Sequence, residues 1–350
     1  MSRPITDLGR TDLRSWDAFV VSHPFGRCRA TSVADLWWNR TSHVLHRLAA
    51  LNEGQVEAGL ALAIKRMPLV PWTVARIVAL MPGGQNVGNS TAALLAAAES
   101  IARRLRSLEI VFDCWMPLDF ELGDIRYAEP VMQALQKAGY ASVGPSRGTY
   151  LVRIDKEDEP LLASFSSKAR RDARKGLREG VTVRRLDARE HLKFFADTHE
   201  EMRHRKGQIQ LDEFPFETSL PLFERGYFRL FGAEYQGNLC NMALTDALGV
   251  PQYVRGATSG AAFESGVPPT GQTLHYEIMK HFRQQGGTYY DLGGVPGPEP
   301  QRRHPNYTVW RFKHEFGGRY VELMPRYQLS LGIFGKMAMA AARHLLGKRG

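Results

Sequence analysis

The stretch GQTLHYEIMKHFRQQGGTYYDLGGV, residues 271–295, decides the fold. Leu274, Ile278 and Phe282 recur every four residues between charged side chains, which predicts an amphipathic helix with one buried stripe. A Gly-Gly pair ends this helix, and the β-prone Thr-Tyr-Tyr run that follows predicts a strand. The strand ends in a glycine bend at residues 291–294, where positive φ angles and close backbone approach are allowed. Such bends expose main-chain donors beside a rigid element, so we expect a ligand site there.

Composition indicates a globular protein that favours anionic partners. The chain has 350 residues, of which 43% are hydrophobic and 23% charged, so it can form one large or two medium domains. Its net charge of +10 favours tRNA, a nucleotide-linked substrate or an acidic membrane surface, although many basic proteins bind no polyanion.

The cysteines and the N-terminus point to the reducing cytoplasm. Three cysteines lie far apart without a C-x-x-C pair, so neither a disulfide framework nor a cysteine zinc site is indicated. Residues 1–16 lack the apolar core of a signal peptide, and no run reaches the ~18 apolar residues of a membrane-spanning helix. The histidines follow no metal-ligand spacing, so no metal site is predicted. We therefore expect a cytoplasmic protein.

The order of the predicted elements indicates an α/β fold with a boundary near residues 155–160, which are polar and end in proline. The first part contains a helix at 11–22, strands at 56–65 and 72–81, a helix from 90 or 91 to 105, a strand at 109–115, a helix at 129–138 and a strand at 149–154. The second part contains a basic helix at 166–179, a strand at 181–185, a helix at 189–204, strands at 227–244 and 252–258, and the helix and strand of 271–295. The similar order of the two parts suggests an internal duplication.

A basic amphipathic helix is predicted near the end of the chain, at residues 329–346. Such a helix either packs on its own domain or lies on an anionic membrane surface.

Three segments resemble one known family. The helix and YDLGG ending of 271–295, the segment FKHEFGG at 312–318, and SSKARRDARK at 166–175 are similar to the Fem-type (FemABX) peptidoglycan aminoacyltransferases. That family belongs to the GNAT acyltransferase superfamily. The segment GVTV at 180–183 extends the third match.

The resemblance implies two GNAT-like domains in tandem with a mixed sheet. The domains would cover residues 1–154 and 155–328, with the site in the second, and residues 329–350 would form the C-terminal helix. The helical arm found in some family members has no counterpart here, because the region at 207–221 is short.

Two residues of the second domain are candidate catalytic groups. The resemblance implies that Lys313 stabilises the oxyanion that forms when an amine attacks an ester carbonyl. Asp291 would orient that amine or accept its proton. Without the resemblance, Lys313 would be interpreted as a surface strand residue. Asp291 would be interpreted as an Asx-type residue that accepts hydrogen bonds from turn amides.

The basic helix is the predicted anion-binding surface. Arg171, Lys175 and Arg178 share one face, with Arg170 and Arg174 beside them. The opposite face is predicted to pack through Phe165, Ala169, Ala173 and Leu177. The cationic face would hold phosphates of tRNA or of a nucleotide-linked precursor, or it is a solvated charged surface.

Four further residues complete the predicted substrate site: Tyr290, Phe312, Gly293 and Gly294. Tyr289, Tyr307 and Trp310 are also aromatic residues able to stack on a sugar or base, although aromatic residues in strands more often belong to the core.

The implied function is transfer of an aminoacyl group from aminoacyl-tRNA to an amine of a UDP- or lipid-linked peptidoglycan precursor. No motif of a covalent route is present, so direct attack without a further cofactor is expected. One alternative is an acyl-coenzyme A-dependent N-acyltransferase acting on a cell-envelope sugar, although residues 268–273 hold fewer glycines than the GNAT coenzyme A loop. Another is a non-catalytic RNA- or membrane-binding protein. The chain would act in the cytoplasm or at the inner face of the plasma membrane.

Overall fold

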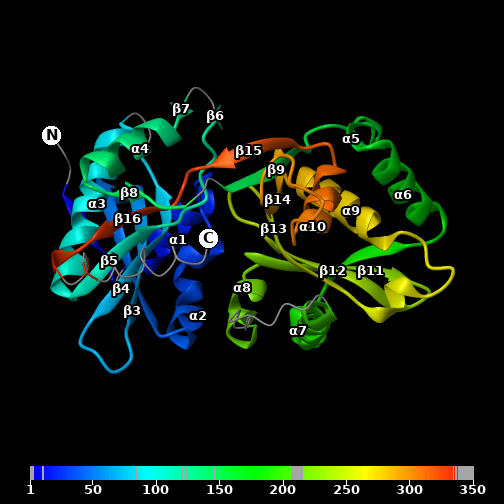
Figure 1. Cartoon of the computed structure of the whole chain (residues 1–350), viewed down its shortest axis with the longest axis horizontal. Helices are drawn as coiled ribbons and strands as arrows, with labels where there is room; N and C mark the ends of the chain where they lie inside the picture. The colour runs from blue at the N-terminus through cyan, green and yellow to red at the C-terminus, as the bar shows by residue number, and fades with distance from the viewer. Residues whose placement is uncertain are drawn as a thin grey trace. The chain divides into compact units, whose positions relative to one another are not determined.

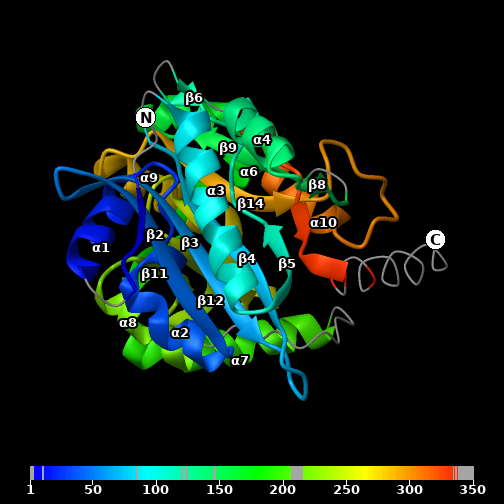
Figure 2. The same cartoon turned by 90° about the vertical axis from the view of Figure 1, so that its left-hand side faces the viewer.

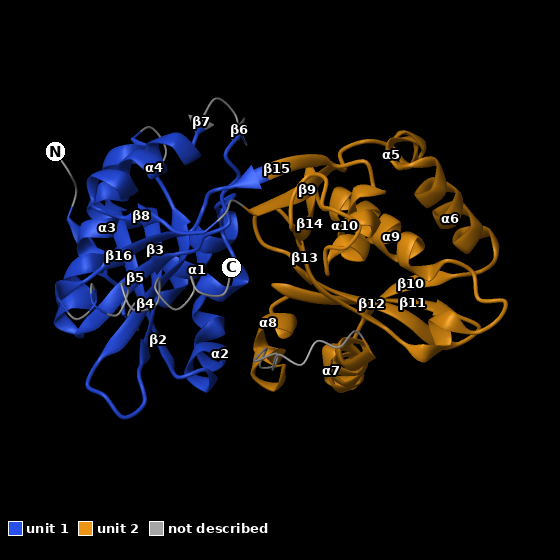
Figure 3. Ribbon diagram, in the orientation of Figure 1, with its two compact units in different colours: residues 1–146, 322–350 blue, residues 147–321 orange. Residues whose placement is uncertain are grey.

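The computed structural model describes residues 4–9, 12–83, 86–119, 121–122, 125–144, 147–205, 216–333, 335 and 337. The chain divides into two compact units, one of residues 1–146 with 322–350 and one of residues 147–321 (Figure 3). Each unit is built on a seven-stranded mixed sheet, which confirms the predicted α/β class.

Unit 1 has the strand order β1-β2-β3-β4-β5-β16-β8. Its strands are β1 (Ile5–Asp7), β2 (His43–Asn52), β3 (Gln55–Arg66), β4 (Thr73–Met81), β5 (Ser107–Phe112), β8 (Ala141–Ser142) and β16 (Tyr327–Ser330). Its helices are α1 (Leu13–Ser22), α2 (Asp35–Arg40), α3 (Val87–Arg104) and α4 (Ala128–Lys137). Helix α3, whose alanine- and leucine-rich face is buried, lies across the sheet (Figure 2). The helices and strands predicted before residue 146 are confirmed, and helix α2 and strands β1, β2 and β8 are additional. The strand predicted at 149–154 is β9 (Arg147–Arg153) and belongs to the sheet of unit 2.

Unit 2 has the strand order β10-β11-β12-β13-β14-β9-β15. Its strands are β9 (Arg147–Arg153), β10 (Thr182–Leu186), β11 (Phe228–Tyr235), β12 (Asn238–Asp246), β13 (Gln252–Thr258), β14 (Tyr289–Val295) and β15 (Arg319–Leu323). Its helices are α5 (Asp158–Ser164), α6 (Ser167–Arg178), α7 (Ala188–Arg205), α8 (Leu220–Glu224), α9 (Thr270–Gln284) and α10 (Tyr307–His314).

The strand predicted at 227–244 is two strands. Gln236 and Gly237 have φ angles of 50° and 79° and form the turn between β11 and β12. The long β-prone run hid this turn, because a glutamine does not signal a positive φ angle as a glycine does.

The two sheets share one plan, and each receives a strand from the other part of the chain. In both, an antiparallel run of four strands is followed by a parallel step, β4 to β5 in unit 1 and β13 to β14 in unit 2. In each sheet, the strand beyond this parallel step is not the next strand in sequence. Strand β16, near the C-terminus, inserts between β5 and β8, and β9, which follows β8 in sequence, inserts between β14 and β15 (Figure 1). This repeated order supports the predicted duplication.

The exchange of strands explains why the unit boundaries differ from those expected at 154 and 328. Strand β9 pairs with β14, so unit 2 begins at residue 147. Strand β16 pairs with β5, so the chain returns to unit 1 at residue 322. The helix predicted at 329–346 is wrong at its start, because Leu329 and Ser330 belong to β16. Residues 338–350 lie outside the described residues.

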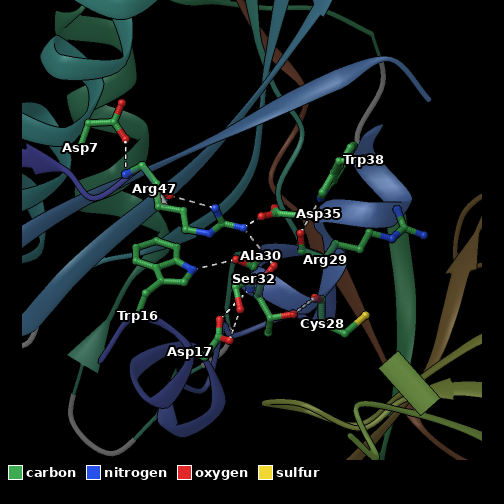
Figure 4. Close-up of polar contacts among 12 residues, drawn as sticks. Asp7, Trp16, Asp17, Cys28, Arg29, Ala30, Ser32, Asp35, Trp38 and Arg47 are labelled. Atoms are coloured by element: carbon green, nitrogen blue, oxygen red, sulfur yellow. Dashed lines mark hydrogen bonds and ion pairs between the residues drawn. The ribbon is translucent and has the colours of Figure 1, made fainter. Parts of the chain in front are cut away.

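Buried polar contacts tie the segment between α1 and α2 to the sheet of unit 1 (Figure 4). Arg47 of β2 is 1% exposed, and its guanidinium pairs with Asp35 of α2. The indole nitrogen of Trp16 donates to the carbonyl of Ala30 at 2.7 Å. Nη2 of Arg47 also donates to the carbonyl of Thr31 at 3.4 Å, and Cys28, Ala30 and Thr31 are fully buried, so the irregular segment packs as part of the core.

The strand exchange predicts how fragments of the chain fold. Residues 147–324 carry all seven strands of their sheet, so this fragment is expected to unfold cooperatively on its own. Residues 1–146 lack β16, which is the sheet partner of β8 and covers the edge of β5, so this fragment is expected to be poorly folded. Thermal unfolding followed by circular dichroism, with the full chain as reference, checks both. A cooperative transition of fragment 1–146 would contradict the role given to β16.

Candidate active site

Lys313 lies on helix α10 and is buried. The helix follows the proline-containing loop after β14, and its Trp310 indole donates to the carbonyl of Pro298 at 2.8 Å and to the hydroxyl of Tyr150 at 3.1 Å. These bonds fix the loop and the helix on strand β9. Lys313 is 7% exposed, and its Nζ donates to the carbonyl of Gly294 at 3.0 Å. The interpretation of Lys313 as a surface strand residue is therefore wrong.

A β-bulge in β14 forms the floor of this site. Asp291 pairs with Leu151 and Gly294 pairs with Thr149, so β14 carries one extra residue between these pairs. Gly293 has a φ angle of 77°, and a Cβ there would lie 2.7 Å from the carbonyl oxygen of Tyr253 and 3.4 Å from Lys313 Nζ. The predicted glycine bend is confirmed, and only glycine fits at this position.

Asp291 is fully buried, and its carboxylate is held by donors of the protein itself. Oδ1 accepts from the main-chain N–H of Gly293 at 2.7 Å and from the hydroxyl of Thr149, and Oδ2 accepts from the side-chain amide of Gln252 at 2.6 Å. The bond to Gly293 is the Asx-type contact expected from the sequence. With both oxygens engaged, the geometry favours a role in shaping the bulge and in providing negative charge for Lys313.

Burial and charge set the protonation of Lys313. Desolvation lowers its pKa to about 8, and the negative charge of Asp291 opposes this shift. At pH 7 the protonated form of Lys313 therefore predominates. Desolvation and the charge of Lys313 lower the pKa of His275 to about 3, so this imidazole stays neutral. The ammonium of Lys313 is thus a cation held in an apolar setting, where its electrostatic effect is strong.

Aromatic side chains surround Lys313. The ring of Tyr253 lies 5.6 Å from Nζ, and His275 packs against Tyr253 at 4.6 Å and Phe312 at 5.5 Å between ring centroids. The hydroxyl of Tyr290 hydrogen bonds with Nδ1 of His275 at 3.3 Å. Tyr290 is fully buried, which favours the core interpretation over contact with substrate.

Sequence reasoning missed His275, Tyr253, Gln252 and Thr149. His275 follows Leu274 on the amphipathic helix, and this place on its buried side was the available signal. Thr149 and Gln252 reach Asp291 from strands that are distant in sequence, so no local pattern marks them.

The basic helix α6 packs on α9 through small residues. Its buried face is Ala169, Ala173 and Gly176, and a Cβ at Gly176 would lie 2.1 Å from Thr273 Oγ1. Leu177, predicted to be packed, is 40% exposed. That prediction is wrong, because close helix packing selects the glycine one position earlier.

The cations of α6 form one exposed surface. A depression is lined by Ser167, Arg170, Arg171, Arg174, Lys175 and Arg178. Several of them have carboxylate partners: Arg174 pairs with Glu159, and Lys175 and Arg178 lie 3.8 Å and 3.4 Å from carboxylate oxygens of Glu179. The predicted cationic face is confirmed as a surface.

Known proteins resemble the chain over most of its length. It is 25% identical over 399 aligned residues to the Lipid II:glycine glycyltransferase of Staphylococcus aureus (strain USA300), covering 89% of this chain and 92% of the relative. The Fem-type resemblance is confirmed. The relatives named as glycyltransferases also bear out the prediction that the chain is an acyltransferase. No protein-family model matches the sequence.

Solved structures share the fold of this chain. The crystal structure of FemX superposes with a TM-score of 0.79 at 23% identity, covering 92% of this chain and 96% of FemX. A tandem GNAT protein from the clavulanic acid biosynthesis pathway gives a TM-score of 0.54 at 15% identity, covering 94% and 98% of the two chains. The predicted tandem GNAT-like fold is confirmed.

Two further observations concern regions named in the sequence. The alignment of 399 residues is longer than the 350 residues of this chain, so the relative has segments without a counterpart here. The region at 207–221, where the arm was expected to be missing, lies outside the described residues up to 215. Within the described part of the chain, no helix is both long and apolar enough to cross a bilayer.

Proposed function

We propose that this Fem-type chain transfers an aminoacyl group from aminoacyl-tRNA to an amine of a lipid-linked peptidoglycan precursor. The observation that carries the proposal is the position of Lys313, a buried ammonium held at the bulge of β14 in the segment that matches the Fem-type pattern. The relatives named for lipid II motivate the choice of acceptor. The reaction belongs on the cytoplasmic side of the membrane, where charged tRNA is found.

The proposed chemistry is direct attack in a ternary complex. The acceptor amine attacks the ester carbonyl, a C–N bond forms, and the ester C–O bond to the terminal ribose breaks. The ribose hydroxyl leaves with a proton, and the attacking amine loses one. The ammonium of Lys313 would stabilise the negative oxygen of the tetrahedral intermediate, because a fixed cation in a desolvated site costs little reorganisation.

The cationic face of α6 would hold phosphates of the donor or of the acceptor. Arg171 and Arg178 are 76% and 73% exposed, so their guanidiniums are accessible to a polyanion. Arginine offers bidentate contacts to phosphate oxygens, and their number sets the salt dependence of binding.

A binding titration tests both the donor and the helix. We expect charged tRNA to bind more tightly than acetyl-coenzyme A at low salt, with an affinity that falls as salt rises. Replacing Arg171, Lys175 and Arg178 together by glutamine should weaken tRNA binding about tenfold or more and flatten its salt dependence. Arg153, an exposed residue of the same unit that pairs with Asp155, provides a matched control as Arg153→Gln.

The outcomes of this titration distinguish the proposed function from its alternatives. Preference for acetyl-coenzyme A would replace the proposed donor and make the chain an acyl-coenzyme A-dependent N-acyltransferase. If the triple variant binds tRNA as well as the wild-type chain at every salt concentration, the cationic face of α6 is a solvated charged surface and not a binding site. Tight, salt-sensitive RNA binding without transfer to a lipid-linked acceptor would favour a non-catalytic protein.

A further inference from the structure

A second group of cations lies in unit 2, at the C-terminal end of α9. Arg185 of β10 is opposite Phe231 of β11, and Arg229 is two residues before Phe231. Directly opposed residues of an antiparallel pair share a face, and diagonal neighbours lie within reach of long side chains. The ring of Phe231 packs on His281 of α9 at 5.0 Å. Arg185, Arg229 and His281 therefore meet on the face of the sheet that α9 covers.

The guanidinium of Arg229 is fixed by neutral acceptors. Nε donates to the carbonyl of Gly226 at 3.3 Å, and Nη1 donates to Nε2 of His281 at 2.8 Å and to the side-chain oxygen of Gln285. Because arginine can only donate, Nε2 of His281 is the acceptor and stays unprotonated. Among the described residues, Nη2 of Arg229 has no hydrogen-bond partner.

The positive charge of this group is not balanced by a carboxylate in the described part of the chain. Neither Arg185 nor Arg229 forms an ion pair there. By contrast, the nearby cations Lys280 and Arg283 of α9 both pair with the carboxylate of Asp158 of α5. Burial and the charge of Arg185 lower the pKa of Arg229. Burial, and then the charges of Arg229 and Arg185, lower the pKa of His281.

The helix end alone does not neutralise the group. The C-terminus of α9 contributes about half of one negative charge, and the effect falls off within the last turn. Arg185 and Arg229 carry two full positive charges, which this partial negative charge does not balance. Two neighbouring guanidiniums on one face of the sheet, each with N–H groups to donate, match the oxygens of a phosphate, which accepts several charge-assisted hydrogen bonds.

We propose that Arg185 and Arg229 form a binding site for a phosphate group at the C-terminal end of α9. The site is separate from the surroundings of Lys313. Gly271 at the start of α9 lies against the ring of Phe312, and His281 follows ten residues later, about 15 Å along the helix axis. The site thus adds an anchor for a phosphate-bearing ligand, and it holds whether or not the proposed aminoacyl transfer is correct.

Residue-resolved NMR of the full chain with inorganic pyrophosphate tests the site. We expect chemical-shift changes that saturate at β10, β11 and the last turn of α9. Arg185→Gln removes an exposed side chain, so it should preserve folding and weaken binding at these residues about threefold to tenfold. The double variant with Arg229→Gln should weaken it tenfold or more. Arg184→Gln is the matched control, because Arg184 is the preceding residue of the strand, faces the opposite side and pairs with Glu234.

A second arm distinguishes a soluble phosphate from a lipid headgroup. Vesicles containing phosphatidylglycerol are sedimented with the wild-type chain, Arg185→Gln and Arg184→Gln. Vesicle binding that is lost with Arg185→Gln assigns the site to a lipid phosphate. Pyrophosphate binding that depends on Arg185, without vesicle binding, assigns it to a soluble ligand. If both ligands bind Arg185→Gln as well as the wild-type chain, or neither binds the wild-type chain, the proposal is overturned.

Discussion

Replacing Lys313 by methionine is expected to lower the turnover of aminoacyl transfer by about 10²–10³-fold, because one preorganised oxyanion donor contributes that much in acyl transfer. Methionine keeps the length and the apolar stem of the side chain and removes the charge. The substitution leaves the surface of α6 untouched, so the loss should appear in kcat rather than in the affinity for charged tRNA. Single-turnover transfer from charged tRNA to the lipid-linked acceptor measures it.

Folding of this variant is expected to be intact. The pKa of Lys313 in the folded chain, about 8, lies below its ordinary value of 10.5, so the unfolded chain binds more protons between these values. Burial of the ammonium therefore opposes folding below pH 8, and stability should rise as pH increases through this window. Methionine removes that penalty, so thermal unfolding at pH 7 should shift upward or stay unchanged.

Arg311→Met is the matched control on the same helix, because Arg311 is an exposed cation of α10. It should leave turnover near that of the wild-type chain. An unchanged rate in Lys313→Met would remove the oxyanion role from this residue, whatever the behaviour of the control.

Replacing Asp291 by asparagine is expected to change both stability and the pH dependence of the rate. The side-chain amide of asparagine cannot accept from Gly293, Thr149 and Gln252 at once, so a buried donor loses its partner. We expect a loss of about 2–4 kcal/mol in the free energy of unfolding, measured by urea denaturation at pH 7.

The pH profile separates the electrostatic effect of this substitution from its structural effect. In the wild-type chain, Lys313 loses its proton as pH rises through about 8, so the rate should fall on that limb. The negative charge of Asp291 raises the pKa of Lys313, so its removal should move the limb to lower pH. A lower rate with an unmoved limb would mean that Asp291 acts on the bulge alone and not on the charge of Lys313.

Local pattern in the sequence determined much of unit 2. The four-residue spacing of apolar side chains in 271–295 and the glycines after it specify α9, β14 and the bend, because these features depend on neighbours along the chain. The alternation of small and basic residues likewise specifies α6 and its exposed cations. The resemblance of these segments pointed to the Fem-type family, and that of the segment at 312–318 pointed to Lys313.

Tertiary structure alone decided how these pieces meet. Helix α10 follows a segment with four prolines, so its start could not be seen from periodicity, and the burial of Lys313 depends on contacts with β13, β14 and α9. Thr149 and Gln252 hold Asp291 across 142 and 39 positions of sequence. The exchange of β9 and β16 between the sheets depends on pairings of the same non-local kind. Strand pairing and burial are set by partners distant in sequence, and this is why local pattern specified the elements while only the fold placed Lys313 and Asp291 in one site.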